Sequence, residues 1–155
     1  MEEALTQKAK EVIEEIPYIT IASVTPDGYP WNSPVFAAYD SEYNFFWNSS
    51  SQSQHSQNIN ANGRVFLVIY KSTVGEGNGF GVYFEGEAKE LIAGEELEHA
   101  LQVFYAKKGK QPPSQTEFLA LGTQRLYKAV LRKCWVNAYD KSRTPADWKM
   151  EIKLK

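Results

Sequence analysis

The sequence predicts a mainly β protein whose antiparallel strands close, or nearly close, into a barrel with helices at its margins. Apolar segments of strand length recur along the 155 residues, and short turns rich in glycine, proline or aspartate join several of them. Helical periodicity is confined to a few segments. An open sheet of six or more strands would leave unpaired edges, so closure into a barrel is expected.

The first expected element is a helix that ends at Pro17. Ala9, Val12, Ile13 and Ile16 recur at helical spacing and form one apolar face in a segment that is otherwise mostly polar. This pattern predicts an amphipathic helix that covers part of the sheet.

Three strands should follow in an antiparallel meander. Residues 18–24 (YITIASV) and 31–39 (WNSPVFAAY) read as strands, and Pro-Asp-Gly at 26–28 is typical of the turn between them. Residues 40–42 form the next expected turn, and residues 44–49 (NFFWNS) form the third strand. Because the connections are short, neighbouring strands should pair antiparallel.

The middle of the chain supplies the expected centre of the sheet. Residues 64–71 (RVFLVIYK) are apolar on both faces, which predicts a central strand that is covered on both sides. Glycine at every second position of 75–81 does not match the GxGxxG dinucleotide motif and indicates a flexible hairpin loop. Residues 81–91 then alternate between apolar and polar side chains, so one side of that strand should face solvent or a partner.

The last third of the chain predicts two helices and two strands. Residues 97–105 have a helical apolar face, and Ser114 and Glu117 have the spacing of a capping box. Residues 125–137 (RLYKAVLRKCWVN) and 149–154 (KMEIKL) read as the final strands.

Composition indicates one domain over residues 1–155 and excludes several classes of partner. With 43% hydrophobic residues, a net charge of −2 and scattered lysines and arginines, the chain predicts no nucleic-acid partner. A single cysteine, Cys134, excludes an intramolecular disulfide. The polar N-terminus lacks a signal segment and no apolar run could span a bilayer, so a cytoplasmic location without membrane contact is expected.

Residues 45–65 (FFWNSSSQSQHSQNINANGRV) have the layout of a phosphate site. An aromatic strand ends in a serine cluster where a helix is expected to begin. Backbone N–H groups at a helix start are unpaired and carry the positive end of the helix dipole, and serine hydroxyls add donors. Serine, asparagine and glutamine are also ordinary loop and N-cap residues, so this composition alone leaves both interpretations open.

Two longer patterns resemble a known family. Residues 21–35 (IASVTPDGYPWNSPV) give a strand, a glycine turn and a strand ending in Ser-Pro-Val. Residues 49–65 read Ser-Ser-x-x-Ser-x-His-x-x-Asn-Ile, four residues and Arg-Val, where the family commonly has Thr-Ser-x-x-Ser-x-Lys-x-x-Asn-Leu, four residues and Arg-Val. About residues 5–140 thus resemble the pyridoxamine 5'-phosphate oxidase-like flavoproteins, which are six-stranded antiparallel split β-barrels that bind FMN.

The resemblance implies an FMN-dependent oxidoreductase that works as a homodimer, with FMN in the clefts between the subunits and a small molecule or NAD(P)H as reaction partner. FMN carries the hydride chemistry, so no dedicated acid or base is needed and the catalytic residues stay unknown. By similarity, the residues around the phosphate would be Ser49, Ser53, Gln54 and His55. Those bordering the flavin ring would be Asn32, Ser33, Pro34, Trp47 and Asn48.

The chain departs from the oxidase proper at charged positions. Asn32 and Ala37 stand about where that enzyme carries arginine and lysine, and His55 stands where lysine is usual. The phosphate would then depend on hydroxyls, backbone N–H groups and a histidine, which predicts weak FMN binding that falls as pH rises from 6 to 8. The ending DWKMEIKLK lacks the oxidase's Trp-x-x-x-Arg-Leu-x-Pro segment, so pyridoxamine phosphate is not the expected substrate.

Several alternatives remain beside this interpretation. The chain could be a dimeric module that binds flavin or haem for sensing or storage without turnover, and His55 could be a polar residue on a helix surface. His99 is expected on solvated helix surface, and neither histidine has neighbours with metal-ligand spacing, so no metal site is predicted. The four tryptophans are expected in the core or dimer interface, with Trp47 either in the core or stacked on the flavin.

Overall fold

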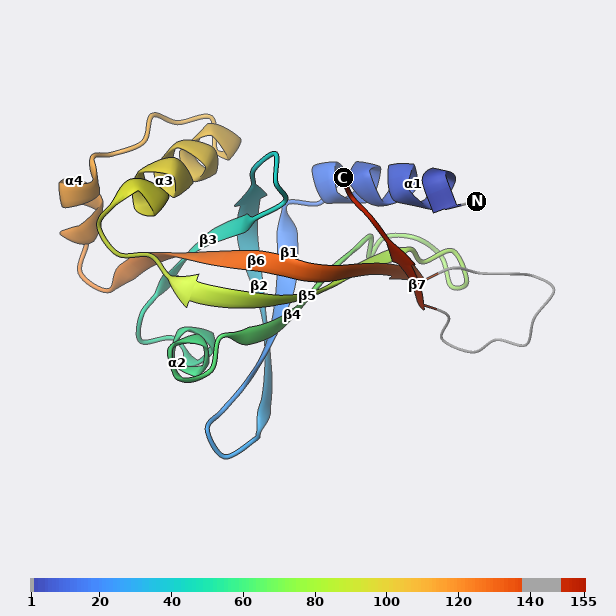
Figure 1. The fold of residues 1–155 in the computed structure, drawn as a ribbon, viewed down its shortest axis with the longest axis horizontal. Helices are drawn as coiled ribbons and strands as arrows, with labels where there is room; N and C mark the ends of the chain where they lie inside the picture. The colour runs from blue at the N-terminus through green and yellow to red at the C-terminus, as the bar shows by residue number, and fades with distance from the viewer. Residues whose placement is uncertain (1, 138–148) are drawn as a thin grey trace.

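Seven strands form one antiparallel sheet in the computed structural model, which describes residues 2–137 and 149–155. The strands are β1 (Tyr18–Val24), β2 (Pro30–Tyr39), β3 (Phe45–Ser50), β4 (Arg64–Tyr70), β5 (Gly81–Glu90), β6 (Gln124–Asn137) and β7 (Lys149–Ile152). Their order is β3-β2-β1-β4-β5-β6-β7, and β3 also pairs with β6. This pairing closes β1 to β6 into a six-stranded barrel, and β7 extends the sheet from β6 (Figure 1). The predicted mainly β barrel is therefore confirmed.

The same residues form four helices: α1 (Glu2–Glu15), α2 (Gln54–Ala61), α3 (Glu95–Lys107) and α4 (Gln115–Leu119). Helix α1 packs against β4, β5 and β7, and α3 covers the outside of β2, β3 and β6 with α4 beside it (Figure 1). Helix α2 contacts β1, β2 and β5 at one end of the barrel. The predicted helices exist, and the predicted Ser114–Glu117 capping box begins α4.

Alternation along the strands separates two hydrophobic cores. On β3, Phe45 and Trp47 face the barrel interior, where they join the core that also contains the buried face of α1. Phe46 lies between them in sequence and points outward, into a second core under α3 with Leu97 and Leu101. Ser49 follows Trp47 by two residues, so the same alternation directs it toward the interior side of the barrel end.

Strand boundaries agree with the sequence pattern to within a residue or two, but one prediction about burial is wrong. Strand β4 lies at the centre of the sheet as expected, yet only one of its faces is covered within a single chain. Barrel closure buries Val65, Leu67 and Ile69 and leaves Phe66 and Tyr70 outside, 36% and 50% exposed. A strand of a closed barrel has one inner and one outer face, which the apolar run alone did not distinguish.

The connection between α2 and β4 makes a close backbone contact with β5. The Ala88 N–H donates to the Gly63 carbonyl at 2.7 Å, and a Cβ atom on Gly63 would lie 2.6 Å from the Ala88 oxygen. Only glycine fits without displacing backbone here. The contact fixes where the chain leaves α2 and enters β4.

The tryptophans divide between core and surface. Trp47 lies in the barrel core, Trp135 is buried against Phe66 outside both cores, and Trp31 is 44% exposed on β2. Trp148 lies outside the described residues. No helix in the described ranges is both long and apolar enough to cross a membrane.

Candidate functional site

The junction between β3 and α2 brings the predicted phosphate-binding side chains together. Strand β3 ends at Ser50, a short turn follows, and α2 begins at Gln54 after its N-cap residue Ser53. The turn is held by the Ser53 N–H, which donates to the Ser50 carbonyl at 3.1 Å. The chain reverses direction here, so the start of α2 lies beside the last residues of β3.

His55 lies at the centre of this junction. Its Nε2 atom is 2.8 Å from Ser49 Oγ and 3.2 Å from Ser53 Oγ, and the Ser53 hydroxyl donates to Ser56 Oγ at 2.9 Å. His55 is only 9% exposed, so the alternative of a solvated surface histidine is wrong. Burial lowers the pKa of His55 below its ordinary value, because the interior disfavours the charged imidazolium.

The first turn of α2 has the chemistry that an anion requires. The turn contains no acidic residue, and no side chain of the described residues caps it, since Ser53 makes no cap hydrogen bond. The backbone N–H groups at the helix start thus stay available beside the hydroxyls of Ser49 and Ser53. This set of donors fits a phosphate group.

The hydrogen bonds continue from Ser56 into the barrel end. The Ser56 side chain bonds to Tyr127, whose hydroxyl donates to Glu90 Oε2 at 3.1 Å. Glu90 Oε1 lies 3.5 Å from Nε of Arg125, and Arg125 is the cross-strand partner of Ser49. We call this set of residues the polar ring: Ser49, Ser53, His55, Ser56, Glu90, Tyr127 and Arg125.

Sequence reasoning missed Glu90, Arg125 and Tyr127 as members of the site. Residues 125 and 127 were assigned to a strand, and the pairing of that strand with β3 could not be read from the sequence. The alternation of side chains along the strand was one available signal. Arg125 lies two residues before Tyr127 and four before Ala129, which both face inward, so Arg125 should face inward too. A charged residue on the inward side of a strand is unusual and often functional.

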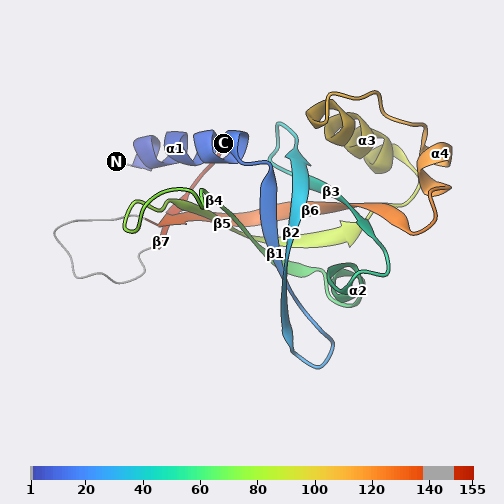
Figure 2. The same ribbon diagram turned by 180° about the vertical axis from the view of Figure 1, so that it is seen from behind.

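The structure does not bring the predicted β2 residues into the polar ring. Asn32 and Pro34 are exposed and pair with β1, while Ser33 Oγ accepts a hydrogen bond from Trp31 Nε1 at 2.8 Å. They pair with residues 20–22, the part of β1 that also pairs with β4, and the tip of the β1–β2 hairpin extends past this region on the side of α2 (Figure 2). Ala37, at the expected lysine position, is buried in the barrel core.

The three remaining predicted residues border the ring without joining it. Gln54 is exposed and its amide donates to Asn58 Oδ1 at 2.9 Å. Trp47 is fully buried and stacks on Tyr127 with ring centroids 5.8 Å apart, which matches the core alternative for this residue. Trp47 Nε1 and Asn48 Oδ1 are buried with no hydrogen-bond partner among the described residues.

Other candidate chemistry is weak in the described part of the chain. No group of three or more histidine, cysteine or acidic residues there could hold a metal ion. Cys134 is buried and burial raises its pKa to about 12, so it is not a reactive thiolate. His99 is exposed as predicted, with Nε2 3.0 Å from Asp40 Oδ2.

Fold and site define a class: a small closed antiparallel barrel with a cluster of hydrogen-bond donors where a short helix meets the barrel end. Residues 5–128 match the family model described as pyridoxamine 5'-phosphate oxidase. The match covers most of the chain, so the protein belongs to this family.

Solved structures share the fold at low sequence identity. A heme binding protein from Mycobacterium smegmatis matches 85% of this chain with a TM-score of 0.69 and 16% identity. The chain spans only 53% of that protein's length. The heme storage protein HutZ from Vibrio cholerae matches 83% of this chain and 90% of its own, with a TM-score of 0.65 and 20% identity.

A putative pyridoxamine 5'-phosphate oxidase from Listeria innocua is also similar. It matches 85% of this chain and 97% of its own, with a TM-score of 0.63 and 15% identity. A search of curated proteins by sequence finds no significant match. At these identities the similarity to solved structures concerns the fold.

Proposed function

We propose that this protein binds FMN with its phosphate at the β3–α2 junction and acts as an oxidoreductase on a small molecule or with NAD(P)H. The observation that carries the proposal is the contact of His55 Nε2 with the hydroxyls of Ser49 and Ser53 at the uncapped start of α2. Membership of the pyridoxamine 5'-phosphate oxidase family supports the choice of FMN among phosphate-bearing ligands.

The chain's own residues would bind and orient the cofactor. Ser49 and Ser53 donate hydroxyl hydrogen bonds, α2 supplies backbone N–H groups, and His55 adds a donor whose charge depends on pH. FMN, when bound, supplies the hydride and electron transfer. Asn32, Ser33, Pro34 and Asn48 remain proposed neighbours of the flavin ring.

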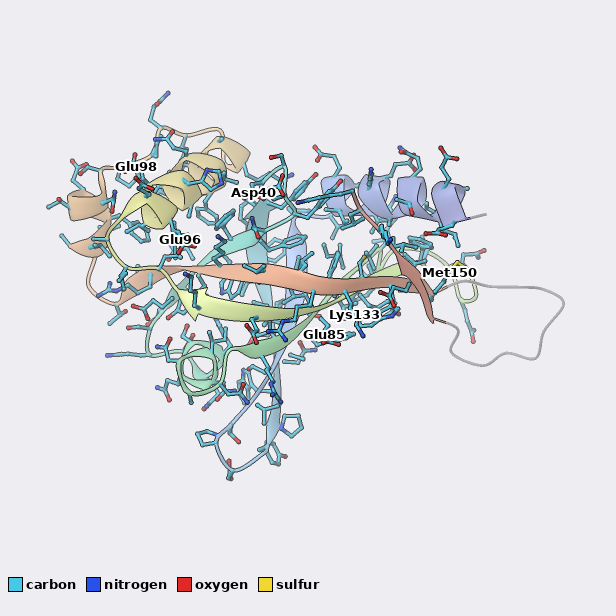
Figure 3. All side chains as sticks on the ribbon, viewed as in Figure 1. Asp40, Glu85, Glu96, Glu98, Lys133 and Met150 are labelled. Carbon is cyan, nitrogen blue, oxygen red and sulfur yellow. The ribbon has the colours of Figure 1, made fainter. Side chains whose placement is uncertain are left out.

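The proposal includes a homodimer and a cytoplasmic location. An outer aromatic face on β4, β5 and β6, made of Phe66, Tyr70, Tyr83 and Trp135, supports the homodimer. Phe66 stacks on Trp135 with ring centroids 6.0 Å apart, and Phe66 and Tyr70 are 36% and 50% exposed. At its border Glu85 and Lys133 are cross-strand partners whose side chains lie close together (Figure 3). A second copy of the chain would cover this aromatic surface.

A dimeric haem-binding module is the second candidate. Two of the similar structures are described as a heme binding and a heme storage protein, which supports it. In this chain the hydroxyls around His55 favour a phosphate over an axial iron ligand, because Nε2 already contacts two serines.

Absorbance spectroscopy of the purified protein separates the candidates. Protein incubated with FMN and desalted should stay yellow, and anaerobic NADH or NADPH should bleach it. A Ser49→Ala, Ser53→Ala double variant should lose the colour, whereas the control Ser72→Ala, on the exposed loop after β4, should keep it. Retained colour without bleaching supports a flavin binder. Protein that takes up haem but not FMN overturns the flavin proposal.

A further inference from the structure

We propose that Arg125 is the fixed cation that binds the FMN phosphate in this chain, and that Glu90 competes with the phosphate for its guanidinium. The proposal rests on the proposed FMN function. Asn32, Ala37 and His55 stand where the oxidase carries positively charged side chains. Arg125 would supply a permanent positive charge in their place.

Cross-strand pairing places Arg125 beside the phosphate site. Arg125 on β6 is the direct partner of Ser49 on β3, and directly opposed side chains in an antiparallel pair lie on the same face about 5 Å apart at Cβ. The next pair along the same face is Trp47 with Tyr127, whose rings stack inside the barrel. Arg125 is therefore on the interior side of the barrel end, next to the Ser49 hydroxyl that His55 contacts.

The guanidinium of Arg125 is held in place but still has donors to offer. Nη1 donates to the carbonyls of Gly122 at 2.8 Å and Gln124 at 2.6 Å, and Nε faces Glu90 Oε1 at 3.5 Å. Nη2 has no acceptor among the described residues. An arginine carries two N–H donors on Nη2, so Arg125 can bind phosphate oxygens through Nη2 while Nη1 keeps its two carbonyl partners.

Glu90 balances this charge at the polar ring. Its Oε2 accepts hydrogen bonds from Tyr127 at 3.1 Å and from Asn60 at 3.4 Å, and its side chain, like that of Arg125, is 25% exposed. A carboxylate this close would repel a phosphate dianion unless Arg125 stood between them. Replacing Glu90 by glutamine keeps an acceptor for Tyr127 and removes the competing charge.

The chain contains a matched control for this pair. Arg132 and Glu87 also join β6 to β5, at 2.6 Å, but their side chains are 60% and 52% exposed on the outer face of the sheet. Arg132 has the same side chain and the same type of partner without proximity to Ser49. Its removal tests the effect of losing one positive charge from the protein as a whole.

The experiment compares FMN with riboflavin, which lacks the phosphate. Dissociation constants are measured by quenching of flavin fluorescence for the unaltered protein, Arg125→Gln, Glu90→Gln and Arg132→Gln, with melting temperatures as a check on folding. Arg125→Gln should weaken FMN binding by about 10- to 100-fold, the range for a hydrogen bond to a charged group, and leave riboflavin binding unchanged. Glu90→Gln should tighten FMN binding, and Arg132→Gln should change neither ligand.

Each outcome decides between the two proposals. If the unaltered protein binds FMN and Arg125→Gln keeps the same ratio of FMN to riboflavin affinity, the role of Arg125 is overturned while FMN binding stands. If the unaltered protein binds neither flavin, both proposals fail. Should Arg125→Gln not fold, Glu90→Gln decides: unchanged FMN affinity in this variant overturns the role of Arg125.

Discussion

Nε2 of His55 lies 2.8 Å from Oγ of Ser49, six residues earlier in the chain, and this contact joins the end of β3 to the first turn of α2. The imidazole of His55 is thereby buried at the proposed phosphate site. FMN affinity and the free energy of unfolding should therefore both depend on pH, and the two effects can be measured separately.

FMN affinity should rise as pH falls below about 6.5, the ordinary pKa of histidine. A bound phosphate favours the imidazolium, so the pKa of His55 is higher in the complex than in the free protein, where burial lowers it. Affinity changes between these two pKa values, by at most about tenfold per pH unit. The structure thus extends the pH window below the range of 6 to 8 expected from the sequence.

The measurement is a series of FMN dissociation constants from pH 5 to 8 for the unaltered protein and for His55→Gln. The phosphate itself titrates near pH 6, so the difference between the two proteins isolates the histidine. Parallel curves for the two proteins would contradict a role for His55.

The free protein should lose stability as pH falls below about 6.5. Because the pKa of His55 is lower in the folded state than in the unfolded state, the unfolded chain binds the proton first. The stabilising contribution is present above the unfolded pKa and is lost as pH falls through the folded one. Urea unfolding at pH 7.5 and 5.5 should show a smaller loss of stability for His55→Gln than for the unaltered protein.

Gly63→Ala should destabilise the protein by about 1–3 kcal/mol, the usual cost of forcing extra volume into a packed site. The new methyl group would lie 2.6 Å from the Ala88 carbonyl oxygen, where the neighbour is rigid strand backbone. Gly79→Ala is the control, because a Cβ atom added there would have no other atom within 4 Å. Equal unfolding free energies for the two variants would show that the Gly63–Ala88 contact is not tight.

Phe66→Glu should convert the proposed dimer into a monomer. The charge would be introduced into the outer aromatic face, beside Trp135, where a second copy of the chain is proposed to pack. Sedimentation equilibrium gives the mass of each variant, and Val74→Glu, on the exposed loop between β4 and β5, is the control. An unaltered protein that is already monomeric would remove the dimer from the proposal.

Local patterns predicted the strands and helices, because alternation, turn residues and capping residues act over a few positions. The stretch from Ser49 to His55 was also readable, since its members are neighbours in sequence. Arg125 and Glu90 reach the site through pairing across about 75 and 40 residues, and no local pattern specifies which strand closes a barrel. Burial of Leu67 but not Phe66 depends on the same closure.

Helix α2 has only eight residues, too few to be stable in water by itself. It persists because Ser56, Asn58 and Ile59 are packed into the barrel end, with Asn58 donating to Ser23 on β1 at 3.0 Å. The helix that is proposed to bind the ligand thus also covers one end of the barrel core. Ligand binding that stabilises α2 should therefore also slow amide hydrogen exchange in β1 and β5, the strands that α2 contacts.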